Sequence, residues 1–194
     1  MDVKIIKYNA GNIQSVIFAL KRIGVEAEVT DDLEKILSAD KIIFPGVGEA
    51  SSAMKYLKQR KLDEAIKSAK QPLLGICLGL QLLCKNSEEN NTECLGIFDT
   101  EVKRFRSNDF KIPQIGWNNI EPIPNELFKG IVKNSYCYFV HSYFAEIGEH
   151  TIAKTNYIND FSSALKKDNF YGVQFHPEKS AETGEKILKN FLEL

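Results

Sequence analysis

The feature that most constrains the fold is the alternation of short apolar runs with amphipathic segments in the first half of the chain. Residues 3–8 predict a buried strand, and residues 12–24 predict a helix that ends at its C-terminal glycine. The alternation continues through a longer helix at about 50–69, the strand "PLLGI" and a helix after Cys77. Strict alternation of this kind predicts a parallel sheet with helices on both faces.

The second half of the chain has a different character. Segments such as "EVKRF", "SYCYFVHSYFAE" and "FYGVQFHP" are rich in β-formers and predict an antiparallel or mixed extension of the sheet. A final helix is expected at about 181–193. No repeat, low-complexity tract or long linker interrupts the sequence. We therefore predict an α/β fold in a single domain over residues 1–194, with a mostly parallel central sheet flanked by helices.

Composition narrows the classes of partner. The net charge is -1, with 43% hydrophobic and 26% charged residues, so nothing favours nucleic acid or a membrane surface. The N-terminal run lacks signal-peptide architecture, and no window offers the roughly 18 apolar residues of a membrane span. The four cysteines show no C-x-x-C pairing and no zinc spacing. We expect a cytoplasmic protein with reduced thiols, no metal and no cofactor.

The most informative short stretch is "GICLG", which places Cys77 between Gly75 and Gly79 where a strand meets a helix. The G-x-S-x-G elbow of the α/β-hydrolases has the same shape and exposes its nucleophile at the sheet edge. A helix N-terminus favours a thiolate, and the unpaired N–H of Leu78 could hold a developing oxyanion. The alternative is a small buried hydrophobe, an interpretation that suits Cys84 on the next helix.

A thiolate nucleophile needs a base and an orienting group. His176 ends an apolar strand in "GVQFHPEKS", and Glu178 follows close enough to accept the imidazole N–H. Cys77, His176 and Glu178 therefore form a triad hypothesis. His141, within "YFVHSYF", faces either the core or a ligand.

The glycine turn "PGVG" at 45–48 has neither the lysine of a phosphate-binding loop nor the spacing of a dinucleotide fingerprint. Two interpretations stay open. It is a tight turn between strand and helix, or it provides a second oxyanion donor near Val47 and Gly48, at the same sheet edge as Cys77.

In this order, "PGVG", "GICLGLQLL" and "GVQFHPEKS" resemble the class I, triad-type glutamine amidotransferases, which have a flavodoxin-like fold. "AGNIQSV", "PQIGWN" and "YFVHSY" are similar to the glutaminase subunits of imidazole glycerol phosphate synthase, so the resemblance spans nearly the whole chain. It implies that Cys77 attacks the side-chain amide of glutamine, that His176 carries the proton to ammonia, and that Glu178 orients His176. Leu78 and the turn at Val47 and Gly48 would form the oxyanion hole.

The resemblance also implies a partner, a (β/α)8 cyclase that forms a heterodimer with the glutaminase and receives its ammonia. The positions it assigns to glutamine binding are Gln81, Glu93, His141, Ser142 and Tyr143. The positions it assigns to the cyclase interface are Asn12, Trp117 and Lys179. Structural alternatives stay open for Gln81 as a helix residue and for Tyr143 and Trp117 as core.

Some positions depart from the family pattern. Lys7, Asn9 and Gln114 replace expected residues near the partner-facing surface, and Cys94 stands where a glycine is common. These departures leave open a paralogous glutaminase subunit that supplies ammonia to another synthase, such as one that amidates a sugar of a surface polysaccharide. Two further classes are a cysteine peptidase or hydrolase on a similar sheet, and a non-catalytic binding module.

Overall fold

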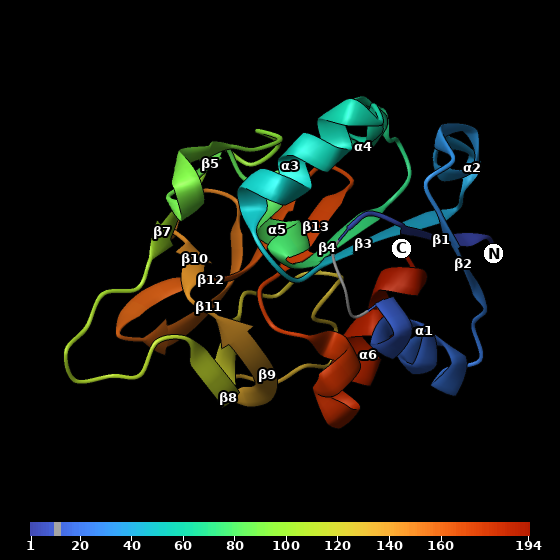
Figure 1. The fold of residues 1–194 in the computed structure, drawn as a ribbon. Helices are drawn as coiled ribbons and strands as arrows, with labels where there is room; N and C mark the ends of the chain where they lie inside the picture. The colour runs from blue at the N-terminus through green and yellow to red at the C-terminus, as the bar shows by residue number, and fades with distance from the viewer. Residues whose placement is uncertain (10–12) are drawn as a thin grey trace.

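A computed structural model describes residues 1–9 and 13–194, so the predicted interface residue Asn12 lies outside the described part. The first half of the chain alternates strand and helix as predicted (Figure 1). Its elements are β1 (Val3–Ile6), α1 (Ile13–Arg22), β2 (Ala27–Thr30), α2 (Leu33–Ser38), β3 (Lys41–Gly46), α3 (Ala50–Gln59), α4 (Leu62–Ser68), β4 (Leu73–Cys77) and α5 (Leu78–Leu83).

The central sheet is parallel. Its strands lie in the order β2-β1-β3-β4-β13, where β13 (Phe170–Val173) returns from the far end of the chain to pair with β4. Strands β1, β3 and β4 are buried along their whole length. Helices α3, α4 and α5 cover one face, and α1 covers the other with the C-terminal helix α6 (Ala181–Leu192) (Figure 1). Burial on both faces explains why these strands are continuous apolar runs.

The second half extends this sheet with mostly antiparallel strands, also as predicted. Beyond β13 the order continues β12-β10-β7-β5-β6, while β11 joins β12 to β8, and β8 pairs with β9. The remaining elements are β5 (Asn86–Ser87), η1 (Glu89–Asn91), β6 (Thr92–Glu93), β7 (Glu101–Arg104), β8 (Gln114–Pro122), β9 (Ser135–His141), β10 (Tyr143–Ala145), β11 (Thr151–Tyr157), β12 (Asn159–Lys167) and η2 (Pro177–Lys179).

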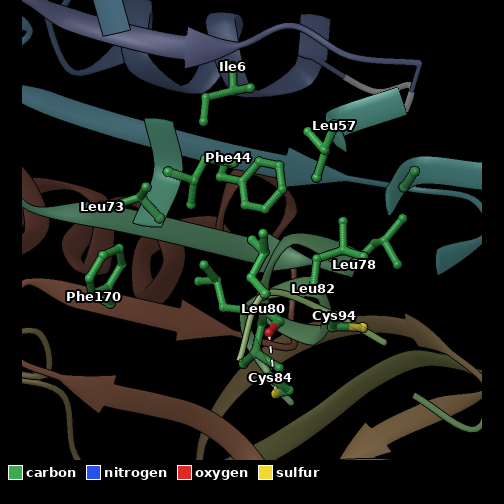
Figure 2. Close-up of a cluster of buried hydrophobic side chains, with 14 of the residues drawn as sticks. Ile6, Phe44, Leu57, Leu73, Leu78, Leu80, Leu82, Cys84, Cys94 and Phe170 are labelled. Atoms are coloured by element: carbon green, nitrogen blue, oxygen red, sulfur yellow. Dashed lines mark hydrogen bonds between the residues drawn. The ribbon is translucent and has the colours of Figure 1, made fainter. Parts of the chain in front are cut away.

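Two apolar clusters fill the space on either side of the sheet. In one, Leu80 and Leu82 of α5 pack toward Phe44 of β3 (Figure 2). Cys84 belongs to this cluster, and its sulfur donates to the carbonyl of Leu80 at 3.4 Å. The interpretation of Cys84 as a packing residue is therefore confirmed. The other cluster joins α1 and α6 to β8 and β9, with Phe139 among its buried residues.

The prediction of one helix over 50–69 is wrong, because the chain turns between α3 and α4. Lys61 adopts the left-handed conformation (φ 56°), which a continuing helix excludes. The turn lets Leu62 and Ile66 of α4 reach the cluster that already holds Leu57 of α3. The apolar spacing continues across the turn, so the hydrophobic pattern does not reveal it.

A helix can cross a membrane only if it is both long and apolar. Within residues 1–9 and 13–194, none is both long enough and apolar enough to cross a bilayer.

Candidate active site

The strand-to-helix junction holds Cys77 in a strained backbone conformation. Cys77 ends β4 with φ 55° and ψ −110°, and α5 begins at the next residue. Non-glycine residues rarely adopt such angles, and they persist only where the surrounding structure enforces them. The thiol is buried, with 6% of the residue exposed. This is the nucleophile-elbow geometry that the sequence predicts.

The two flanking glycines are required by close approach of backbones. A Cβ on Gly79 would lie 1.9 Å from the carbonyl oxygen of Phe44, and one on Gly75 would lie 2.7 Å from the Leu83 side chain. Contacts under 3.0 Å do not occur for real Cβ atoms. Glycine at both positions therefore lets α5 lie directly on β3 and β4, and this close packing fixes the direction in which the elbow points.

His176 and Glu178 lie in the segment after β13, the strand that pairs with β4. The imidazole Nδ1 of His176 donates to Glu178 Oε1 at 2.8 Å, and both residues are buried. The backbone holds the histidine as well, because its N–H donates to Tyr138 O at 2.9 Å and Ser180 Oγ donates to its carbonyl at 2.6 Å. Hydrogen bonds thus hold both the ring and the backbone of His176.

The charge state of His176 follows from its neighbours. Burial disfavours the charged ring, but the Cys77 sulfur, to which it hydrogen bonds, and the Glu178 carboxylate together raise the pKa of His176 to about 10. The imidazolium therefore lies between a sulfur on one side and a carboxylate on the other. This arrangement suits a proton donor placed beside a sulfur nucleophile.

Gln174 was not predicted as a site residue, yet it contacts the sulfur. Gln174 is fully buried, and its Nε2 donates to Cys77 Sγ at 3.7 Å. Its Oε1 accepts from Gln81 Nε2 at 3.0 Å, and the same Gln81 amide donates to the Tyr143 carbonyl at 2.9 Å. A glutamine inside the apolar run "GVQF", two residues before the histidine, was the signal that could have identified it.

A cavity of about 280 Å³ opens over Cys77 and His176. It brings together most of the residues that the sequence predicts for the site. The predicted residues that line it are Val47, Gly48, Cys77, Leu78, Gln81, His141, Ser142, Tyr143, His176 and Lys179. The "PGVG" turn and the elbow therefore lie on one cavity, as their common place at the carboxyl ends of β3 and β4 requires.

Glu93 is not part of this cavity. Its side chain is 80% exposed and faces Lys58 at 3.4 Å. Glu89, four residues earlier, lines the cavity instead, and its Oε2 accepts the N–H of Ala50 at 2.7 Å. Burial raises the pKa of Glu89 above its ordinary value. In this structure Glu89, and not the predicted Glu93, therefore lines the cavity.

His141 is a neutral acceptor facing this cavity. Its Nδ1 lies 2.7 Å from the Tyr143 carbonyl, which can only accept, so the proton is on Nδ1. Nε2 is buried without a hydrogen-bond partner among the described residues. Burial lowers the pKa of His141 to about 4, so the ring stays neutral at pH 7. It therefore differs from His176 in charge although both line one cavity.

The comparison with protein families decides the identity. The glutamine amidotransferase class-I family matches residues 4–194. The chain belongs to this family. Relatives of this amidotransferase are named imidazole glycerol phosphate synthase subunit HisH. The one from Bacteroides fragilis is 59% identical over 100% of both chains, and the one from Haemophilus influenzae is 48% identical over 100% of this chain and 98% of its own.

Solved structures give the same fold for the amidotransferase. One of them, a glutamine amidotransferase, superposes with a TM-score of 0.76, covering 100% of this chain and 98% of its own, at 19% identity. A glutamine amidotransferase from Thermotoga maritima gives a TM-score of 0.65 over 100% of this chain and 83% of its own, also at 19% identity. The predicted fold class, a mostly parallel sheet flanked by helices with a mixed β extension, is confirmed.

An exposed apolar patch lies beside the cavity of the amidotransferase. Strands β8 and β9 present Ile115, Trp117 and Tyr136 to solvent, each more than half exposed. The Trp117 ring packs edge-on against Tyr138 at 5.9 Å, and Lys179 Nζ lies 5.9 Å from the centre of the same Tyr138 ring. The interpretation of Trp117 as a core residue is thus excluded.

The departures from the family pattern lie in different environments. Lys7 and Asn9 are exposed. Gln114, expected near the partner-facing surface, is buried with 4% exposed, and pairs with His141 across β8 and β9. Its side chain therefore points inward, although its strand also carries the exposed Ile115 and Trp117. Cys94 is also buried, in the cluster with Cys84.

Proposed function

We propose that this chain is the glutaminase subunit of imidazole glycerol phosphate synthase, acting as one domain over residues 1–194. It hydrolyses glutamine to glutamate and ammonia, and the ammonia passes to a cyclase subunit of histidine biosynthesis. The observation that carries the chemistry is His176, bonded to Glu178 and to the elbow sulfur of Cys77 in one cavity. The assignment to this synthase rests on relatives of that name at up to 59% identity over the full chain.

The first half of the reaction makes a thioester. The Cys77 sulfur attacks the side-chain carbonyl carbon of glutamine, and its electron pair forms the C–S bond. The carbonyl becomes a tetrahedral oxyanion. When it collapses, the C–N bond breaks and the His176 imidazolium gives its proton to the leaving nitrogen, so that neutral ammonia departs. Glu178 holds the imidazolium ring of His176 in its orientation and stabilises its positive charge.

The second half releases glutamate. His176, now neutral, takes a proton from water as the water oxygen attacks the thioester carbon. Collapse of the second tetrahedral intermediate breaks the C–S bond, and the sulfur leaves as a thiolate beside the restored imidazolium. Because one histidine gives a proton in the first half and takes one in the second, no cofactor is required.

The oxyanion of both steps needs donors fixed in advance. We assign the N–H of Leu78, at the start of α5, and an N–H of the turn at Val47 and Gly48, which lines the same cavity. Donors on rigid backbone stabilise the charge without reorganising when it forms, and loss of one such donor costs about 10²–10³-fold in rate.

The substrate pocket follows from the cavity lining. Glu89, rather than Glu93, is the carboxylate that holds the ammonium of glutamine, because only Glu89 lines the cavity. Ser142 and Tyr143, also on the cavity, seat the rest of the amino acid together with His141. Gln81 acts through its bonds to Gln174 and the Tyr143 carbonyl, which brace the wall of the pocket.

Ammonia released into water would be protonated and lost as a nucleophile, so the site needs a covering partner. The patch of Ile115, Trp117 and Tyr136 suits this role, since aromatic anchors dominate protein interfaces. It is continuous with the cavity through β9 and Lys179. We propose that the cyclase docks here to form a heterodimer, with Asn12 also at the interface. We place this heterodimer in the cytoplasm.

The experiment that tests the partner assignment measures glutamate release from glutamine by this chain, with and without the histidine-pathway cyclase of the same organism loaded with its nucleotide ligand. We expect strong stimulation by the cyclase and one ammonia incorporated per glutamate released. Cys77-dependent hydrolysis that the cyclase does not stimulate would reject this partner. It would assign the chain to another synthase, such as a sugar-amidating one.

A further inference from the structure

The side chain of Tyr8 carries a buried hydroxyl that no interaction described so far explains. The residue lies two positions after the end of β1 and is 5% exposed, with its ring centre 5.3 Å from that of Phe44. Its hydroxyl has no hydrogen-bond partner among the described residues. A buried polar group without a partner costs free energy and is rare in native proteins. Phenylalanine would fill the same space without that cost, so the hydroxyl needs an explanation.

The hydroxyl lies against the turn that we assign to the oxyanion hole. A Cβ built on Gly46 would be 2.1 Å from the Tyr8 oxygen, so this oxygen lies directly against the Gly46 backbone. The same point is 2.9 Å from Leu78 Cβ and 3.1 Å from the N of Gly79, at the start of α5. Tyr8 therefore lies at the junction of the turn and the elbow.

Two further observations define what the hydroxyl can do. Burial, with the charge of Cys77 adding to it, raises the pKa of Tyr8 well above its ordinary value, so the group stays protonated and can donate. Tyr8 is also absent from the lining of the cavity, whereas Val47 and Gly48 line it. The hydroxyl therefore lies against the turn and outside the cavity.

We propose that Tyr8 is a positioning residue for glutamine hydrolysis: its hydroxyl donates to the Gly46 carbonyl in the catalytic arrangement of the "PGVG" turn and thereby directs the Val47 N–H into the cavity. This inference rests on the proposed function.

The geometry of one peptide unit supports this role. The Gly46 carbonyl and the Val47 N–H belong to the same planar trans peptide, so they point in opposite directions. Tyr8 contacts Gly46, at the carbonyl end of this peptide, and Val47, at its N–H end, lines the cavity. A donor that holds the carbonyl on the Tyr8 side therefore aims the N–H at the cavity. Glycine on both sides of Val47 permits this rotation, and Gly48 already has φ 111°.

Tyr8→Phe tests the proposal, because it removes the hydroxyl and nothing else. Glutamate release is measured with the cyclase present, together with the rate of Cys77 alkylation by iodoacetamide and the urea midpoint of unfolding. We expect kcat to fall about tenfold, the effect of one lost hydrogen bond in the transition state. We expect KM to stay within about twofold, and alkylation and the urea midpoint to be unchanged or, for the midpoint, raised.

Tyr171→Phe is the matched control. Tyr171 is equally buried, but its hydroxyl donates to Glu126 on the other face of the sheet. This variant is expected to lower the urea midpoint and to leave kcat unchanged. The positioning role would be overturned if kcat of Tyr8→Phe is unchanged. It would also be overturned if kcat falls and the rate of Cys77 alkylation changes as well. Absence of Cys77-dependent glutamate release in the wild type would instead overturn the proposed function.

Discussion

Gly79→Ala is expected to perturb the elbow in both stability and rate. The added Cβ would lie 1.9 Å from the Phe44 carbonyl oxygen, and real contacts begin near 3.0 Å, so α5 must move from β3 by about 1.1 Å. Overpacking of this kind costs about 1–3 kcal/mol. Alanine recovers about 0.5–1 kcal/mol of helix propensity. We expect a net loss of about 1 kcal/mol in the free energy of unfolding.

The same displacement moves Cys77 and the N–H of Leu78, because Cys77 is the N-cap of α5 and Leu78 is its first residue. Misplacement of reacting groups by about 1 Å can cost 10²-fold in rate. The assays are urea unfolding and glutamate release with the cyclase present. Gly148→Ala is the control, since its Cβ would meet nothing closer than 4.0 Å. A Gly79→Ala variant as stable and as active as Gly148→Ala would refute this explanation of the glycine.

Three further outcomes follow from the site and the patch. Glu89→Gln should raise KM for glutamine at least about tenfold, as expected for a lost charged hydrogen bond. In Glu93→Gln, KM should stay within about twofold of wild type. Equal effects on KM would contradict the choice of Glu89 over Glu93. His141 has a folded pKa of about 4 against an ordinary 6.5, so the unfolded chain binds the extra proton and stability falls as pH drops from 6.5 toward 4. In His141→Phe the dependence of the urea midpoint on pH should be shallower across that window, and an unchanged dependence would contradict the assignment. Trp117→Ala should weaken cyclase binding by about 30-fold in a titration, the loss of an interface anchor of about 2 kcal/mol, while Leu37→Ala on α2 should not change it.

Much of the fold could be predicted because its signals are local. Two of these signals are the apolar runs bounded by glycine and the helical spacing of apolar residues in α1. Both depend only on neighbours in the sequence. The turn at Lys61 was not predicted because the helical spacing of apolar residues continues across it. Only the packing of Leu62 and Ile66 in the buried cluster requires the turn. Tertiary contacts therefore decided where that helix ended.

The site residues also divide into those that local sequence patterns predict and those that only tertiary contacts bring to the site. The elbow glycines and the short spacing of His176 and Glu178 are local patterns, so the sequence indicated their proximity. The choice between Glu89 and Glu93 depends on which way a 3₁₀ turn and a two-residue strand direct their side chains, and spacing does not contain that information. Gln174 contacts the sulfur only because β13 pairs with β4, a contact made across nearly a hundred residues.

The central claim is that one cysteine of four, Cys77, carries glutamine hydrolysis. The most direct test compares Cys77→Ala with Cys84→Ala in the assay of glutamate release with the cyclase present. Both thiols are buried and flank the same helix, but only Cys77 lines the cavity. The account predicts a loss of at least about 10³-fold in Cys77→Ala, as for removal of a nucleophile, and activity within a few-fold of wild type in Cys84→Ala. Glutamate release that survives in Cys77→Ala would contradict it.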